Sequence, residues 1–185
     1  GVPGWPLIPA PVRIVLGVLA LWLAWLAVVQ ARILGINFLL SVLTLVWVAD
    51  IFAYFAGRAF GLRFTRNKLA PSISPGKSWE GVWGGLAGVL CLAVAWVAAD
   101  RYFQADVASF YTRLYSAGWW FLAIAVVFMV AMSVAGDLVE SLVKRAVAAK
   151  DSSQLLPGHG GVLDRVDALL PTLPLALMIT TLLSP

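Results

Sequence analysis

The chain has 185 residues, of which 62% are hydrophobic and 12% are charged, and its mean hydropathy is +0.93. An average soluble domain carries about 25% charged residues, so this composition excludes an ordinary water-soluble protein. The formal net charge of +4 is modest, and the single cysteine, Cys91, excludes an intrachain disulfide and a cysteine-based metal site.

Five apolar runs are long enough to cross a bilayer, which takes about 20 mostly apolar residues. They lie near residues 12–29, 37–57, 81–99, 119–135 and 168–183. The sequence therefore predicts an all-α fold, a polytopic transmembrane helix bundle forming a single integral membrane domain over residues 1–185. Within the last span, Pro171 and Pro174 are expected to kink or locally unwind the helix.

Four glycines recur at helical spacing on the third predicted span: Gly81, Gly84, Gly85 and Gly88. Small residues at such spacing let a second helix approach closely. We expect this stripe to be a helix-packing surface rather than a ligand site.

Charge in the loops predicts the orientation of the bundle. Residues 58–80 contain five basic residues and one acid, whereas residues 100–115 are nearly balanced. By the positive-inside rule the first stretch is cytoplasmic, and the parity of the spans puts residues 136–167 on the same side. Four aromatic residues are expected to form an interfacial belt at the opposite face: Tyr111, Tyr115, Trp119 and Trp120.

A polar stripe extends the fourth span, formed by Asp137, Glu140, Ser141, Lys144 and Arg145. Their spacing of three and four residues gathers them on one side of a helix. Charges facing hydrocarbon are costly, so this stripe must face protein, water or ligand. The simpler alternative is a solvated helix end held together by internal salt bridges.

Beyond this stripe lies a glycine-rich bend around the only histidine, His159, followed by Asp164 and Asp167. The glycines permit close approach of the backbone to a bulky ligand. Asp164 and Asp167 are one helical turn apart, so they either serve one site or cap a helix start. A lone histidine is more often a structural hydrogen-bonding residue than a base or a ligand.

Asp137 and Asp164 are candidates to converge on a divalent cation. Mg²⁺ prefers oxygen ligands and usually takes part of its coordination shell from substrate phosphates. Basic side chains that suit phosphate groups surround this pair in the sequence: Lys144, Arg145, Lys150 and Arg165. Carboxylates and cations at a membrane surface indicate phosphoryl or nucleotidyl transfer.

The segment from Ser141 to Asp167 resembles the phosphatidate cytidylyltransferases, also called CDP-diacylglycerol synthases. The resemblance rests on the pairs Lys144-Arg145 and Lys150-Asp151, the run from Pro157 through His159, Gly160 and Gly161, and the group Asp164, Arg165 and Asp167. A second block resembles the bacterial members of that family, from Trp47 to Arg58 and from Lys68 to Gly81. Together the two blocks and the intervening spans cover roughly residues 45–180.

The resemblance implies a Mg²⁺-dependent transfer of CMP from CTP to phosphatidic acid, giving CDP-diacylglycerol and pyrophosphate. It implies a metal site built from Asp137 and Asp164, and it leaves a second cation open. It further implies a homodimer in the bacterial inner membrane with the active site facing the cytoplasm. Family members usually carry additional N-terminal spans, which this chain is expected to lack.

Asp50 and Lys77 extend the site to the second block. Asp50 lies inside an apolar span, where an acid is functional by default, and Arg58 or Lys77 is its expected partner. A buried pair that fixes helix packing is the alternative. Lys77 and Ser78 are expected to bind phosphate oxygens, although each alone also suits an ordinary solvated loop.

The expected catalytic residues are Asp137, Lys144, Arg145, His159, Asp164 and Arg165. The expected substrate-binding residues are Asp50, Lys77, Ser78, Ser141, Lys150, Asp151, Gly160, Gly161 and Asp167. Phosphatidate would attack the α-phosphorus in line, and its phosphate is already ionised, so no general base is required. The cations would orient the headgroup or stabilise the departing pyrophosphate.

Two other functions remain as alternatives. A CTP-dependent polyprenol or dolichol kinase also needs CTP, a metal and a membrane acceptor, but it releases CDP. A small membrane transporter would have polar residues distributed through its spans. Asp50 is the only strong candidate for such a residue here. Nucleic-acid binding is not expected, because the cations are mixed with acids beside membrane spans.

Overall fold

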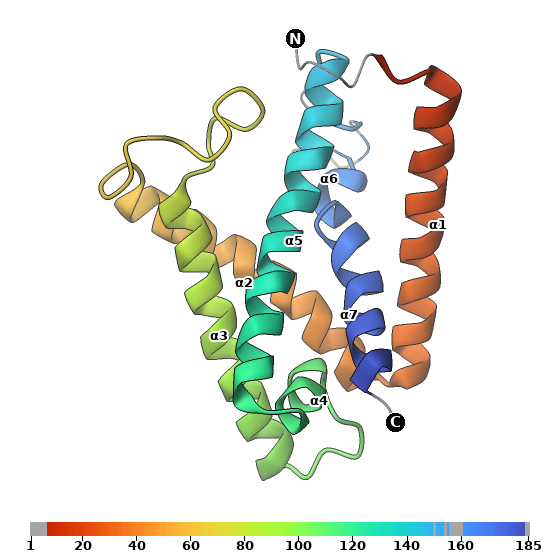
Figure 1. The fold of residues 1–185 in the computed structure, drawn as a ribbon, viewed down its shortest axis with the longest axis vertical. Helices are drawn as coiled ribbons and strands as arrows, with labels where there is room; N and C mark the ends of the chain where they lie inside the picture. The colour runs from red at the N-terminus through yellow and green to blue at the C-terminus, as the bar shows by residue number, and fades with distance from the viewer. Residues whose placement is uncertain (1–6, 150, 154, 156–160, 184–185) are drawn as a thin grey trace.

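The computed structural model describes residues 7–149, 151–153, 155 and 161–183. The described residues form seven helices and no strand (Figure 1). Their bounds are Ala10–Leu34 for α1, Ile36–Phe60 for α2, Trp79–Tyr102 for α3, Phe110–Ser116 for α4, Trp119–Ala146 for α5, Leu163–Val166 for α6 and Leu169–Leu183 for α7.

Five helical segments are long and apolar enough to cross a membrane: α1, α2, α3, α5, and α6 with α7 taken together. Each contains one of the five predicted spans, so the all-α polytopic bundle is confirmed. Large apolar side chains such as Trp25, Ile33 and Phe55 are exposed on its outside, as expected for a protein solvated by hydrocarbon. The protein is an integral membrane protein.

The helices α3, α5 and α7 stand roughly upright in Figure 1, α1 packs against α7, and α2 runs obliquely across the bundle. The core between them contains Val42, Leu45, Val89, Met129 and Ala176, all fully buried. This arrangement brings α2 into contact with α3, α5 and α7, and α5 into contact with α3 and α7.

The chain's two polar segments lie at the same end of the bundle. The loop between α2 and α3 and the described part of the segment between α5 and α6 are both at the top of Figure 1, and α4 is at the bottom. We call the top the site end and the bottom the far end. The predicted sharing of one face by the two polar segments is confirmed.

The glycine stripe of α3 faces α2, as predicted. A Cβ atom at Gly85 would lie 2.8 Å from the carbonyl oxygen of Ala49, and one at Gly81 would lie 3.0 Å from that of Ala53. Only glycine therefore allows the two backbones to approach this closely. The close crossing fixes where the α2–α3 loop starts and ends.

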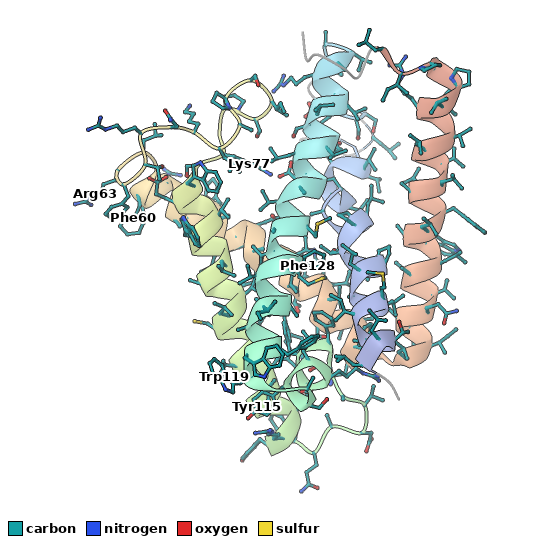
Figure 2. All side chains as sticks on the ribbon, in the orientation of Figure 1. Phe60, Arg63, Lys77, Tyr115, Trp119 and Phe128 are labelled. Carbon is teal, nitrogen blue, oxygen red and sulfur yellow. The ribbon has the colours of Figure 1, made fainter. Side chains whose placement is uncertain are left out.

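The expectation for Tyr111 is wrong. Tyr111 is fully buried in α4 together with Phe110 and Leu114, so it belongs to the core and not to an interfacial belt. Burial also raises the pKa of its phenol. Trp119 is exposed at the far end, where Figure 2 also shows Tyr115, and both positions fit the predicted belt.

The predicted interruption of the last span occurs at Asp167 and Ala168, between α6 and α7. Pro171 has no N–H to donate to the carbonyl of Asp167, four residues earlier. That carbonyl accepts instead from the N–H of Leu170, at 3.3 Å. Gly136 of α5 packs on this break, because a Cβ there would lie 2.9 Å from the Asp167 carbonyl oxygen.

Candidate active site

The site is built on the end of α5, which continues to Ala146 beyond the apolar run. Its polar stripe faces α6 and the α2–α3 loop, and Glu140 is only 7% exposed. The contacts reach other elements, so the alternative of a solvated helix end held only by internal salt bridges is not what the structure shows.

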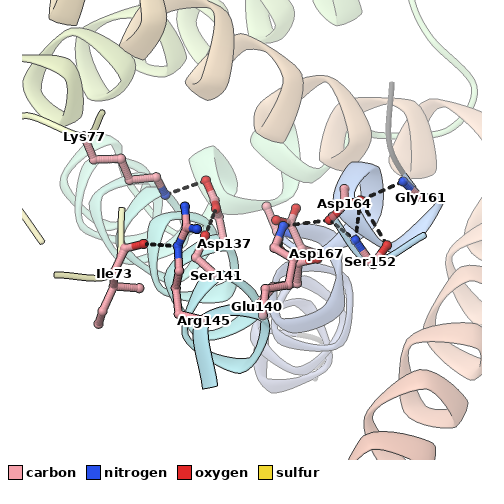
Figure 3. A network of polar contacts seen from close by, with 12 residues as sticks. Ile73, Lys77, Asp137, Glu140, Ser141, Arg145, Ser152, Gly161, Asp164 and Asp167 are labelled. Carbon is pink, nitrogen blue, oxygen red and sulfur yellow. Dashed lines mark hydrogen bonds and ion pairs between the residues drawn. The ribbon is translucent and has the colours of Figure 1, made fainter. Parts of the chain in front are cut away.

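Asp137 is paired with Lys77 from the α2–α3 loop (Figure 3). The Nζ atom of Lys77 lies 2.5 Å from Oδ2 of Asp137. The hydroxyl of Ser141, one turn further along α5, donates to the other carboxylate oxygen at 3.3 Å. This ion pair joins the second sequence block to the polar stripe of α5.

Lys144 lies between two carboxylates. It pairs with Glu140 one turn earlier on α5, and its Nζ lies 2.6 Å from Oδ1 of Asp164 on α6. Glu140 was not among the predicted site residues, although its place in the stripe, three residues after Asp137, was the signal for it. The pairings tie α5 to α6.

Asp164 also accepts hydrogen bonds from two residues that precede α6, Ser152 and Gly161. It accepts hydrogen bonds from the N–H of Ser152 at 3.0 Å, from the Ser152 hydroxyl at 3.0 Å and from the N–H of Gly161 at 2.7 Å. A Cβ at Gly161 would lie 2.9 Å from the backbone nitrogen of Ser153, so glycine is required for this close approach. Asp164 thus ties Ser152 and Gly161 to α6.

Asp50 and Asp167 complete a group of acids at the site. The charges of Asp50 and Asp137 both interact with that of Asp167, and Asp50 also interacts with Lys77. Oδ1 of Asp167 accepts the N–H of Ala168 at 2.7 Å, directly before α7. Of the two partners predicted for Asp50, Lys77 is the one whose charge acts on it. Arg58 donates to the Tyr54 hydroxyl, at 3.0 Å.

A pocket of about 450 Å³ lies beside this group, between α2, α3 and α5. Its polar lining includes Asp50, Arg58, Lys77 and Asp137, and its apolar lining includes Val130. The pocket therefore runs from charged residues at the site end to apolar residues deeper in the bundle.

The remaining predicted residues lie around this centre. Arg145 is exposed, and its Nε donates to the carbonyl of Ile73 at 3.4 Å. Ser78 is buried as the N-cap of α3 and accepts the N–H of Gly81 at 3.2 Å, while also lining the pocket. Arg165 on α6 and Asp151 are exposed. The predicted residues Lys150, His159 and Gly160 lie outside the described residues.

Glu80 is a second residue that the sequence prediction missed. It is buried in the first turn of α3, and its Oε1 accepts from the N–H of Phe64 at 3.1 Å, the N–H of Thr65 at 2.7 Å and the Thr65 hydroxyl at 2.8 Å. The only signal in the sequence was a single acid in a basic loop. Glu80 holds the loop that carries Lys77.

The donor set fits Mg²⁺. Five carboxylates gather here against two paired lysines: Asp50, Asp137, Glu140, Asp164 and Asp167. The excess negative charge beside hydrocarbon favours a bound cation, and all the acidic donors are oxygens. Within the described residues no three acidic, histidine or cysteine side chains form a ready metal cage. Mg²⁺ needs none, because it usually takes one or two carboxylates and completes its shell with water and substrate.

Comparison with known proteins places this chain. The phosphatidate cytidylyltransferase of Haemophilus influenzae is 50% identical over 140 residues, which are 76% of this chain and 44% of that protein. The phosphatidate cytidylyltransferase of Pseudomonas aeruginosa is 45% identical over 164 residues, which are 88% of this chain and 55% of that protein. The one of Thermotoga maritima is 40% identical over 145 residues, which are 78% of this chain and 49% of that protein. The chain thus spans about half the length of the curated relatives it matches. The model of the cytidylyltransferase family matches residues 10–183, and the chain therefore belongs to that family.

Proposed function

We propose that this protein transfers CMP from CTP to phosphatidate, producing CDP-diacylglycerol and pyrophosphate. The observation that carries the proposal is the paired network of Lys77, Asp137, Lys144 and Asp164 beside a pocket that extends into the bundle. A soluble nucleotide and a membrane-bound lipid can meet only at such a boundary. The names of the similar proteins support the same reaction.

Asp137 and Asp164 would hold Mg²⁺, which when bound supplies neutralisation of the triphosphate charge. Each carboxylate now faces a lysine, Lys77 or Lys144. With the two carboxylates so engaged, Lys77 and Lys144 would be available to the phosphates of the substrates. Asp50 and Asp167 offer carboxylates for a second cation.

In the reaction, a phosphate oxygen of phosphatidate attacks the α-phosphorus of CTP. The bond from that phosphorus to the bridging oxygen of the β-phosphate breaks, and pyrophosphate leaves with the electron pair. Lys77, Lys144 and Arg145 orient the phosphates and stabilise the charge that develops on the leaving group. The phosphate nucleophile is already ionised, so no general base is required. His159 and Arg165 donate further hydrogen bonds to phosphate oxygens.

We place the site end on the cytoplasmic side of the bacterial inner membrane, where CTP is available. The basic α2–α3 loop supports this orientation. A homodimer is proposed as the working assembly.

The test is to incubate the purified protein in detergent with CTP, dioleoylphosphatidate and Mg²⁺, and to measure pyrophosphate and CDP-diacylglycerol. We expect the two products in equal amounts. Asp137→Asn and Asp164→Asn should each lower kcat by about 100-fold or more, which is the usual effect of losing a group that stabilises charge in the transition state. Asp106→Asn, at the exposed far end, is the matched control. Near-normal turnover by both site variants would refute the metal assignment, and release of CDP would indicate a lipid kinase.

A further inference from the structure

The pocket beside the site has an edge on the lipid-facing surface of the protein. Tyr54 and Arg58 line the pocket from α2 and are both exposed. Their neighbours Ile51 and Phe55 are exposed apolar residues of the same membrane-spanning helix. Arg58 lies two residues before the end of α2, a membrane-spanning helix, and a long basic side chain near a span end can extend its charge to the lipid headgroups.

Arg58 has the charge that an anionic headgroup needs. Two cations, Arg58 and Lys77, line the pocket, and Lys77 is already paired with Asp137. No carboxylate among the described residues forms an ion pair with Arg58. Arg58 is thus the cation of the pocket that has no carboxylate ion-pair partner among the described residues.

Tyr54 positions this guanidinium. Nη1 of Arg58 donates to the Tyr54 hydroxyl at 3.0 Å, which uses one of its five N–H donors. The hydroxyl accepts that bond, so its own proton remains available to a second acceptor. A phosphomonoester has three terminal oxygens and matches such a set of donors, whereas a phosphodiester has two.

We propose that Arg58, held by Tyr54, selects the phosphomonoester headgroup of a lipid that enters the pocket from the bilayer. The nucleotide reaches the site from the side of Lys144 and Arg145. This inference rests on the proposed function and assigns the lipid substrate to one edge of the pocket. Arg58 contacts the substrate, and Tyr54 is its positioning residue.

The kinetic test separates the two substrates. Arg58→Gln should raise the KM for phosphatidate about tenfold or more, the expected loss of a charge-assisted contact, and leave the KM for CTP unchanged within about twofold. Arg58→Lys should fall between wild type and Arg58→Gln, because an ammonium lacks the bidentate geometry. Tyr54→Phe should raise the KM for phosphatidate less than Arg58→Gln does.

Arg63→Gln is the matched control, since Arg63 is an exposed arginine of the α2–α3 loop and Figure 2 shows it at the outer edge of the molecule. It should leave both KM values unchanged. A rise in the KM for CTP with Arg58→Gln, or equal effects of Arg58→Gln and Arg63→Gln, would overturn the inference.

A binding measurement keeps the inference testable without turnover. Tryptophan fluorescence in detergent micelles reports binding of dioctanoylphosphatidate, with dioctanoylphosphatidylglycerol as the phosphodiester comparison. The wild type should prefer the phosphomonoester, and Arg58→Gln should lose that preference while its thermal unfolding stays unchanged. Retained preference would overturn the inference. If the preference for the phosphomonoester depends on Arg58 but the protein forms no CDP-diacylglycerol, the lipid site would be upheld and the proposed reaction refuted.

Discussion

Lys144 is the residue on which the junction of α5 and α6 depends. It is 18% exposed and lies between Glu140 and Asp164. The carboxylate of Glu140 is buried and has no hydrogen bond among the described residues, so Lys144 is its partner there. Asp164 has backbone donors from Ser152 and Gly161 as well. Loss of the lysine is therefore more serious for Glu140 than for Asp164.

Lys144→Met should lower the free energy of unfolding by about 1–3 kcal/mol, because it leaves the buried carboxyl group of Glu140 without its partner. The double variant Glu140→Leu with Lys144→Met should regain much of this loss, since neither charge then remains. Thermal unfolding in detergent measures both. Arg145→Met, at the exposed neighbouring position, is the control for stability and should change it by less than about 0.5 kcal/mol. Additive losses in the double variant would contradict the pairing.

At the scale of elements, one buried acid anchors the start of the α2–α3 loop. Glu80 belongs to α3 but accepts three hydrogen bonds from Phe64 and Thr65 near the start of the loop. The N-cap Ser78 fixes the other end of the loop on α3. Lys77 lies between these two anchors, so its reach to Asp137 depends on both.

Glu80→Ala should free the start of the loop while leaving the helices intact. The amide protons of Phe64 and Thr65 should exchange with solvent about 10- to 100-fold faster, the effect of losing hydrogen bonds to a charged acceptor. Hydrogen exchange followed by mass spectrometry measures this, and far-ultraviolet circular dichroism checks the helices. Glu80→Gln retains one acceptor oxygen and should give a smaller change. Unchanged exchange in Glu80→Ala would show that other contacts hold the loop.

The spans could be predicted from the sequence because hydrocarbon imposes a length and a polarity on each of them. The polar stripe of α5 followed from its helical spacing. Tyr111 could not be placed, since α4 is short and an aromatic residue near a span end suits either an interface or a core. Glu80 was missed because its three partners precede it by 15 or 16 residues in an irregular loop. Pairings such as Lys77 with Asp137 depend on tertiary structure, which residue spacing does not encode.

Over the whole molecule, positive charge is concentrated at the site end. Nine described basic residues lie there: Arg13, Arg58, Arg63, Arg66, Lys68, Lys77, Lys144, Arg145 and Arg165. Three lie at the far end: Arg32, Arg101 and Arg113. The far end has its own acid, Asp100, which accepts hydrogen bonds from Asn37, Ser109 and Thr112 and so ties α2, α3 and α4 together. Basic residues near span ends remain on the cytoplasmic side during insertion, so this asymmetry predicts the orientation.

Single cysteines introduced at the two ends test this orientation. The background is Cys91→Ser, which removes the only native thiol. Ser72→Cys in the α2–α3 loop and Ala105→Cys after α3 are both at exposed positions. In intact spheroplasts, a membrane-impermeant maleimide should label Ala105→Cys and not Ser72→Cys, because the basic site end is held in the cytoplasm. Permeabilised cells should show both thiols labelled, which confirms that each is reactive. The opposite pattern in intact spheroplasts would place the site end outside, away from CTP, and would contradict both the orientation and the proposed use of that nucleotide.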